Sequence, residues 1–226
     1  PPTVSYHDVM RSDAGVAQWL GRTAQFIAGT TYGSRADAMQ LIERVRRIHA
    51  SIQGTAPDGQ PYAADDPDLL TWVHVAEVSS FMAGYLRYVG PLSVAEQDRY
   101  FEEEATVAAL LGAPDVPRSR AQVDAYLEAQ RPALMNSDRT KEVVRLIMAM
   151  PVANPLLVPA VRTMADAGVA LLPPWARRML ELHRQSLRRS LALAGMRGLA
   201  PTLRWALGPG LAARARRRVA AKTTAV

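Results

Sequence analysis

The chain has 226 residues, no cysteine, a formal net charge of +6 at pH 7, and 49% hydrophobic against 21% charged residues. This is the composition of a folded globular protein long enough to bury a sizeable core, and it excludes disulfides, thiolate metal sites and cysteine nucleophiles. No uncharged apolar run is long enough to cross a bilayer, so no membrane-spanning helix is predicted. Because a chain without cysteine fits a reducing compartment, we expect a cytoplasmic protein, with peripheral contact to a membrane as an option.

Helix signals dominate the chain, because Ala, Leu, Arg and Glu are frequent and alternating β-branched runs are scarce. In chain order, helices are predicted over residues 15–30, 36–53, 67–88, 94–111, 120–130, 138–150, 156–171 and 175–194, with a last element over 201–218. Residues 54–66 are predicted to form a loop, because Pro57-Asp58-Gly59 is turn chemistry. The sequence therefore predicts an all-α fold.

Capping residues set several of these boundaries. Asp66 precedes Pro67, which suits the first helical position. Ser93 with Glu96 has the capping-box pattern, and Gly112 stops the helix that it opens. A second box begins at Ser119, and a further helix has its cap at Ser34. Ser137 or Asp138 caps the helix that runs to 150.

The positive charge is concentrated at one end of the chain. Residues 173–226 carry twelve Arg and Lys against one acidic residue, whereas residues 1–172 carry 15 basic and 20 acidic residues. We therefore expect a helical core over 1–174 and a basic amphipathic helical tail over 175–226, packed on the core or extending from it. With Trp175 and Trp205 as its aromatic residues, the tail fits peripheral membrane contact better than nucleic-acid binding. A solvated helix face or a contact between subunits of a homo-oligomer stays an equal alternative.

Two of the four histidines fall on consecutive predicted helices. His49 lies at the edge of an apolar stripe and is expected to point into the core or a core-facing pocket, and His74 has Glu77 one turn later. A neutral imidazole nitrogen binds haem iron or another transition metal, although a helical histidine is more often a hydrogen-bonded core residue. Glu77 fits a role in orienting His74 or as a base, and equally a buried ion pair or a surface charge.

Arg46 lies one turn before His49, where a guanidinium suits a carboxylate such as a haem propionate. The alternative is a solvated charge on the outer helix face. The two histidines are widely separated along the chain and no His-Glu-x-x-His pattern occurs, so no zinc signature is present. No Gly-x-Ser-x-Gly elbow supports serine catalysis either.

An ordered set of motifs carries a resemblance to a known family. Thr23 precedes Tyr32-Gly33, and there follow Arg46-x-x-His49, Gly54, Gly59-x-Pro61-Tyr62, Asp65-Asp66-Pro67-x-Leu69-Leu70-x-Trp72-Val73-His74, Gly90-Pro91-Leu92-Ser93, Glu96-x-Asp98-x-Tyr100, Leu111-Gly112 and Val116-Pro117-x-Ser119. Over roughly residues 4–182 the chain resembles the family of MpaB and rubber oxygenases (latex-clearing proteins). Each piece is short, and their order and spacing give the resemblance its specificity.

The resemblance implies a globin-like multi-helix bundle around haem b, and an oxygenase that uses dioxygen on a small, hydrophobic, alkene-containing substrate of isoprenoid or lipid type. It implies that His49 is the proximal haem-iron ligand and that Arg46 and His74 belong to the haem site. It also places Thr23 on the distal side, and implies that Thr23 and Arg46 take part in catalysis by supporting the haem or the distal pocket. No nucleic acid is expected as a partner.

Two positions depart from the family pattern. The family Arg four residues before Thr23 falls on Trp19, with Arg22 as its nearest substitute. The distal catalytic Glu of rubber oxygenases has no clear counterpart, and the nearest upstream polar residues are His7 and Asp8. The alternative is therefore a family member without haem that serves as a lipid- or isoprenoid-binding module, or as a membrane-associated interaction module.

The side chains of Tyr62, Trp72, Phe81, Tyr85 and Met148 to Met150 are candidates for an apolar pocket, or for ordinary core packing.

Overall fold

The computed structural model describes residues 13–56, 59–149, 152, 154–182, 194 and 210–223. Its elements are α2 (Asp13–Tyr32), α3 (Arg35–Ala50), β1 (Gln53–Thr55), β2 (Pro61–Ala63), α4 (Pro67–Tyr88), α5 (Val94–Leu111), α6 (Arg120–Gln130), η1 (Arg131–Ala133), α7 (Asp138–Met148), η2 (Pro155–Leu157), α8 (Val158–Leu171), α9 (Pro174–Met179) and α11 (Leu211–Thr223). The prediction of an all-α fold is confirmed. His7, Asp8, Met150 and Trp205 lie outside the described residues.

The helix starts follow the capping residues closely. The Asp66 side chain accepts hydrogen bonds from the backbone N–H groups of Asp68 and Leu69, and α4 begins at Pro67. Ser93 and Glu96 form a complete capping box at the start of α5, which ends at Gly112 with a left-handed φ of 116°. These boundaries agree with the sequence because each depends on contacts within one turn of helix.

Three boundaries differ from the prediction. The helix α3 ends at Ala50 because Gln53–Thr55 pairs antiparallel with Pro61–Ala63, a short hairpin where the sequence predicts a loop. The helix α9 ends at Met179, where the Asn136 amide donates to the Met179 carbonyl oxygen at 2.7 Å, whereas the sequence predicts one helix over 175–194. Residues 183–193 of that prediction lie outside the described residues. The last element described is α11, Leu211–Thr223, which ends beyond the predicted 201–218, and residues 201–209 of that prediction lie outside the described residues.

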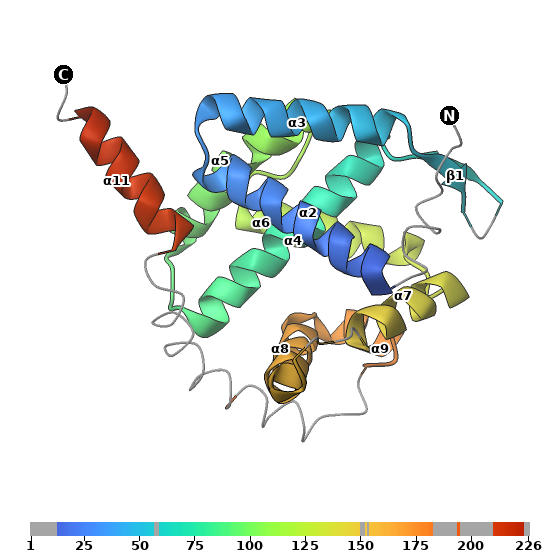
Figure 1. Ribbon diagram of the computed structural model, residues 1–226. Coiled ribbons are helices and arrows are strands. Elements are labelled where there is room, and N and C mark those ends of the chain that lie inside the picture. Colours follow the sequence, from blue (N-terminus) through green and yellow to red (C-terminus); the bar gives the residue numbers. More distant parts are fainter. Residues whose placement is uncertain are drawn as a thin grey trace.

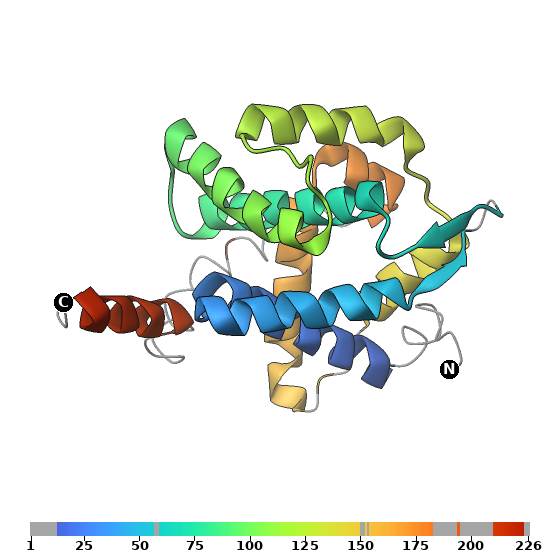
Figure 2. The same ribbon diagram turned by 90° about the horizontal axis from the view of Figure 1, so that it is seen from above.

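The helices form two layers. The antiparallel pair α2 and α3 makes one layer, and α4, α5 and α6 make the other; the turned view in Figure 2 separates them clearly. Contacts between α3 and α5 join the layers, while α8 packs against α4 and α7 touches α2. The helix α11 extends outward beside the α2–α3 turn (Figure 1). No helix in the described ranges has the length and apolarity needed to cross a bilayer.

The hydrophobic core lies in the second layer. Five of its most buried side chains form one cluster, in which α4 contributes Val75, Val78 and Met82, α5 contributes Phe101, and α6 contributes Val123. By contrast, α2 and α3 contribute Ile42 as their one fully buried residue among the side chains described. The layer of α4, α5 and α6 is therefore the rigid base against which the α2–α3 pair is placed.

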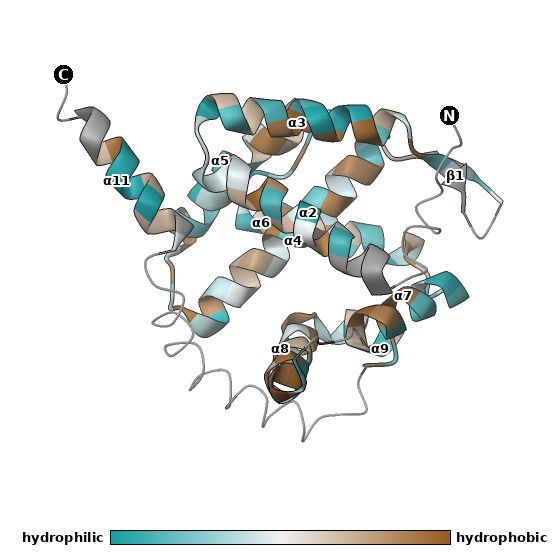
Figure 3. Ribbon diagram, viewed as in Figure 1, coloured by the Kyte–Doolittle hydropathy of each residue, from teal (hydrophilic) through white to brown (hydrophobic). Residues whose placement is uncertain are grey.

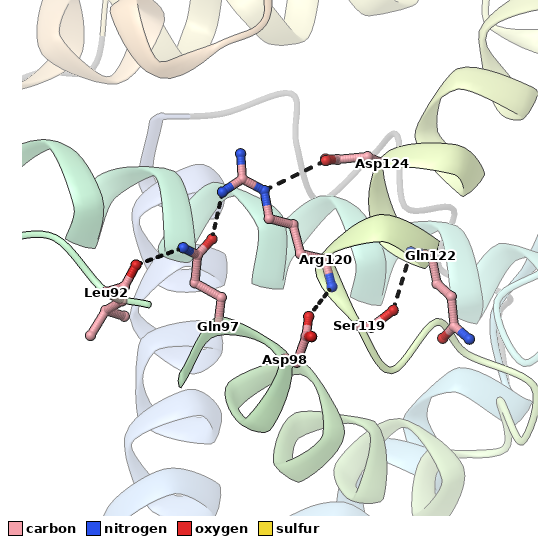
Figure 4. A network of polar contacts seen from close by, with 7 residues as sticks. All are labelled: Leu92, Gln97, Asp98, Ser119, Arg120, Gln122 and Asp124. Carbon is pink, nitrogen blue, oxygen red and sulfur yellow. Dashed lines mark hydrogen bonds and ion pairs between the residues drawn. The ribbon is translucent and has the colours of Figure 1, made fainter. Parts of the chain in front are cut away.

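A polar network ties α5 to α6 beside this core (Figure 4). Gln97, 3% exposed, donates to the Leu92 carbonyl oxygen at 2.9 Å and accepts from the Arg120 guanidinium at 3.0 Å. The Arg120 backbone N–H donates to the Asp98 carboxylate at 2.7 Å. Because the buried amide of Gln97 bonds through both its oxygen and its nitrogen, the network fixes how α6 sits on α5.

Candidate functional site

His74 lies on α4, next to the buried stripe that faces the core. Its Nε2 atom is fully buried and has no hydrogen-bond partner among the described residues. Burial lowers the pKa of His74 to about 4, so the imidazole is neutral at pH 7. In the tautomer with its proton on Nδ1, the Nε2 lone pair is free to bind a metal or to accept a hydrogen bond. An orphaned buried nitrogen of this kind costs free energy unless something satisfies it.

His49 lies in the last turn of α3 and is half-buried. Burial lowers its pKa, while the negative charge of Asp65 acts in the opposite direction. His49 is therefore also a neutral imidazole at pH 7, which is the form that ligates iron. Its position on the α2–α3 layer, with His74 on the α4 layer, places the two candidate ligands on different layers of the fold.

Arg46 and Thr23, the other two predicted site residues, lie on α3 and α2. The Arg46 side chain is exposed on α3, one turn before His49, and Thr23 is half-buried on α2. Trp19, at the position of the family Arg, is half-buried on the same helix. Among the described residues, no hydrogen bond or ion pair joins any two of Thr23, Arg46, His49 and His74.

Two half-buried acidic side chains lie on neighbouring helices of the second layer. Glu77 follows His74 by one turn on α4, and Glu104 lies on α5. Burial raises the pKa of Glu77, and the charge of Glu104 raises it further. Burial also raises the pKa of Glu104. The pKa of Tyr100 is raised first by burial and then by the charges of Glu104, Glu77 and Tyr32, the last of which lies on α2. These four residues therefore gather where α4 and α5 meet the end of α2.

Sequence reasoning singled out Glu77 but missed Glu104. The available signal was its register, because Glu104 directly precedes the buried Ala105 and lies one turn after Tyr100. A carboxyl group at such a position is drawn toward the interior. What the register does not reveal is that Glu77, on the preceding helix, is its electrostatic neighbour.

The aromatic residues expected to line an apolar pocket are divided between interior and surface. Tyr62 and Trp72 are half-buried, as is Met148. Phe81 and Tyr85 are 45% and 44% exposed, so they lie at the surface of α4. The side chains of the buried α4 face are Leu70, Thr71, Val75, Val78 and Met82.

The two histidines are compatible with the ligand requirement of a haem. Among the described residues, no three His, Cys, Asp or Glu side chains come together as a metal-binding group. A haem needs only one or two axial side chains, because its four ring nitrogens complete the coordination. The neutral His49 and the orphaned Nε2 of His74 both meet that need.

The chain was compared with known proteins. A family model described as "ER-bound oxygenase mpaB/B'/Rubber oxygenase, catalytic domain" matches residues 5–205. The search of curated proteins and the search of solved structures give no match.

Proposed function

This chain belongs to the family of the mpaB/B' and rubber oxygenase catalytic domain, and from that premise we propose that it is a haem-b-dependent oxygenase. Its substrate would be a small, hydrophobic, alkene-containing molecule of isoprenoid or lipid type, with dioxygen as the co-substrate. Oxygenases of this family are in general haem-dependent. The observation that carries the proposal is the pair of neutral, half-buried imidazoles, one with a buried, unpartnered nitrogen, in a chain of this family.

We assign the axial iron ligand to His49 and a place in the haem site to His74. Arg46, exposed one turn before His49, has the reach and charge to pair with a haem propionate at the protein surface. Thr23 on α2 would supply a hydroxyl group on the distal side. When bound, the haem would supply the oxygen and redox chemistry.

The protein's own contribution follows from burial. Low polarity around His49 and His74 keeps both rings neutral at pH 7, so a ligating nitrogen does not compete with a proton. The raised pKa values of Glu77, one turn from His74, and of Glu104, the electrostatic neighbour of Glu77, make these carboxyl groups candidates to hold and release a proton.

The test is the visible absorption spectrum of the purified, haem-supplemented protein before and after dithionite. We expect a Soret band that shifts on reduction. His49→Ala should abolish that band. His74→Ala, matched in size and chemistry, should retain it with altered position or affinity, and the reverse outcome would move the ligand assignment to His74.

A second pair of substitutions tests the assignment of Arg46 to a haem propionate. Arg46→Ala should weaken haem binding, whereas Arg47→Ala, an exposed neighbour on the same helix, should not. Equal effects of the two substitutions would contradict the role of Arg46.

A haem-free lipid- or isoprenoid-binding role is the second candidate. The half-buried Trp19 favours it, because an apolar indole occupies the place of the family Arg. A featureless spectrum after haem addition, together with lipid that co-purifies with the protein, would select this role.

A further inference from the structure

The helix α11 is a concentrated positive charge on the outside of the molecule. Its sequence has four arginines and one lysine and no acidic residue. The side chains of Arg214, Arg216, Arg217 and Arg218 are all exposed. Figure 3 shows that the middle of this helix is strongly hydrophilic and that the helix extends away from the two layers. Such a helix favours an anionic partner.

One arginine attaches α11 to the body of the protein. The Arg218 guanidinium Nη2 donates to the carbonyl oxygens of Tyr32 at 2.6 Å and Gly33 at 3.0 Å. These carbonyls lie at the end of α2, where unpaired carbonyl groups and the helix dipole attract a cation. The Arg218 charge also contributes to lowering the pKa of Asp37, after the hydrogen bonds from Ser34. Arg214, Arg216 and Arg217 have no described acidic partner.

The surface beside this attachment combines basic and apolar side chains. Arg35 follows Gly33 by two residues and is exposed. Tyr32 is 38% exposed, Met39 is 43% exposed, and Val219 of α11 is 63% exposed. Basic residues beside an aromatic ring and exposed apolar groups are the composition of surfaces that lie on a bilayer. Asp37 is the acidic side chain in this patch, and it is already bonded to Ser34.

We propose that α11 and the α2–α3 turn form a docking surface for a membrane of anionic lipid, with Arg214, Arg216 and Arg217 as its charged contacts. The charge complementarity selects an anionic surface. The exposed apolar groups favour lipid over nucleic acid, because Tyr32 is the one aromatic residue identified in the patch for stacking on bases. This surface goes beyond the proposed oxygenase function and does not depend on it.

The experiment is sedimentation of the full chain with vesicles of phosphatidylcholine and phosphatidylserine in equal amounts, at physiological salt. A basic residue near such a surface contributes about 1 kcal/mol, a factor of about five in partitioning. The triple variant Arg214→Gln, Arg216→Gln and Arg217→Gln should therefore bind on the order of a hundredfold more weakly. The triple replacement of the same arginines by lysine should restore binding.

The matched control removes three exposed arginines from other elements: Arg145→Gln on α7, Arg162→Gln on α8 and Arg178→Gln on α9. It lowers the net charge equally, and these helices lie away from α11 in Figures 1 and 2. The control should bind like the unchanged chain. Equal loss in both triple variants would show a net-charge effect and overturn the proposal.

Two further outcomes would also overturn it. One is that the chain binds vesicles of phosphatidylcholine alone as well as it binds vesicles that contain phosphatidylserine. The other is tight, α11-dependent binding of a single-stranded oligonucleotide by a chain that does not bind vesicles. Since vesicle binding is measured without haem, its failure leaves the oxygenase proposal standing, and the absorption spectrum tests that proposal separately.

Discussion

At the scale of single residues, burial shapes the site by favouring neutral side chains. It lowers the pKa of His74 to about 4 and raises the pKa values of Glu77 and Glu104. The directions are opposite, but each shift disfavours the charged form, as expected where charges leave water. Burial therefore acts against the charged form of all three side chains.

Glu104→Gln should stabilise the haem-free protein at pH 8. The folded-state pKa of Glu104 is raised above its ordinary value, so protonation stabilises the fold at low pH and this stabilisation is lost as pH rises through the folded pKa. Glutamine keeps the shape of the side chain without the charge. The gain in melting temperature should be largest at pH 8 and should vanish at about pH 4, where an ordinary glutamate takes up its proton.

Glu102→Gln is the control for this prediction. Glu102 is exposed on the same helix and pairs with Arg118 at 2.8 Å, so its replacement should leave the melting temperature unchanged or slightly lower. A destabilised Glu104→Gln protein at pH 8 would show that the carboxylate has a favourable partner.

At the scale of elements, α5 shows how local contacts define a helix. The Ser93 hydroxyl oxygen accepts from the Glu96 backbone N–H at 3.3 Å, and the Glu96 carboxylate accepts from the Ser93 backbone N–H at 2.8 Å. The hydrogen bonds from Ser93 also lower the pKa of Glu96. This reciprocal pair satisfies N–H groups that the first turn leaves free.

Ser93→Ala should lower the free energy of unfolding by about 1 kcal/mol, because an N-cap hydrogen bond is lost. In a chain of this size that loss lowers the melting temperature by roughly 2–4 °C. Thermal unfolding followed by circular dichroism measures it. Ser80→Ala is the control: the exposed Ser80 hydroxyl donates to the Ala76 carbonyl oxygen within α4, and alanine is at least as good a helix residue there. Equal losses in both variants would argue against the cap.

At the scale of the whole molecule, stability is concentrated in the layer of α4, α5 and α6. Phe101 is 2% exposed at its centre, packed with Val75 and Val78 and in edge contact with Tyr100 at 5.4 Å between ring centroids. The α2–α3 layer joins this base chiefly through α3 and α5. Disruption of the base should therefore affect the whole fold and both candidate ligands.

Phe101→Ala should cost about 3–5 kcal/mol of unfolding free energy, since it removes a buried ring and leaves a cavity. Phe81→Ala removes the same ring from a site that is 45% exposed, and should cost less than about 1 kcal/mol. Urea unfolding of the two variants measures the difference. Comparable losses would mean that Phe81 is covered in solution.

At the candidate site, the sequence identifies the two histidines but not their chemical state. His49 and His74 were identifiable from their rarity, their helical positions and the family motifs around them. Their neutral state and the orphaned Nε2 of His74 depend on burial by other helices, which no local pattern specifies. The electrostatic interaction between Glu77 and Glu104 was hidden for the same reason, because it acts between two helices.

The sequence by itself determined the all-α class, the helix starts at Pro67 and Val94, and the stop at Gly112, because these depend on neighbours within one turn. Only the tertiary structure decided which face of α4 is buried. That helix is apolar on nearly all sides, so the sequence left Phe81 a candidate for an apolar pocket, whereas packing against α5 and α6 buries Val75 and Val78 and leaves Phe81 exposed. A helix without a distinct polar face takes its orientation from its partners, and those lie far away in the sequence.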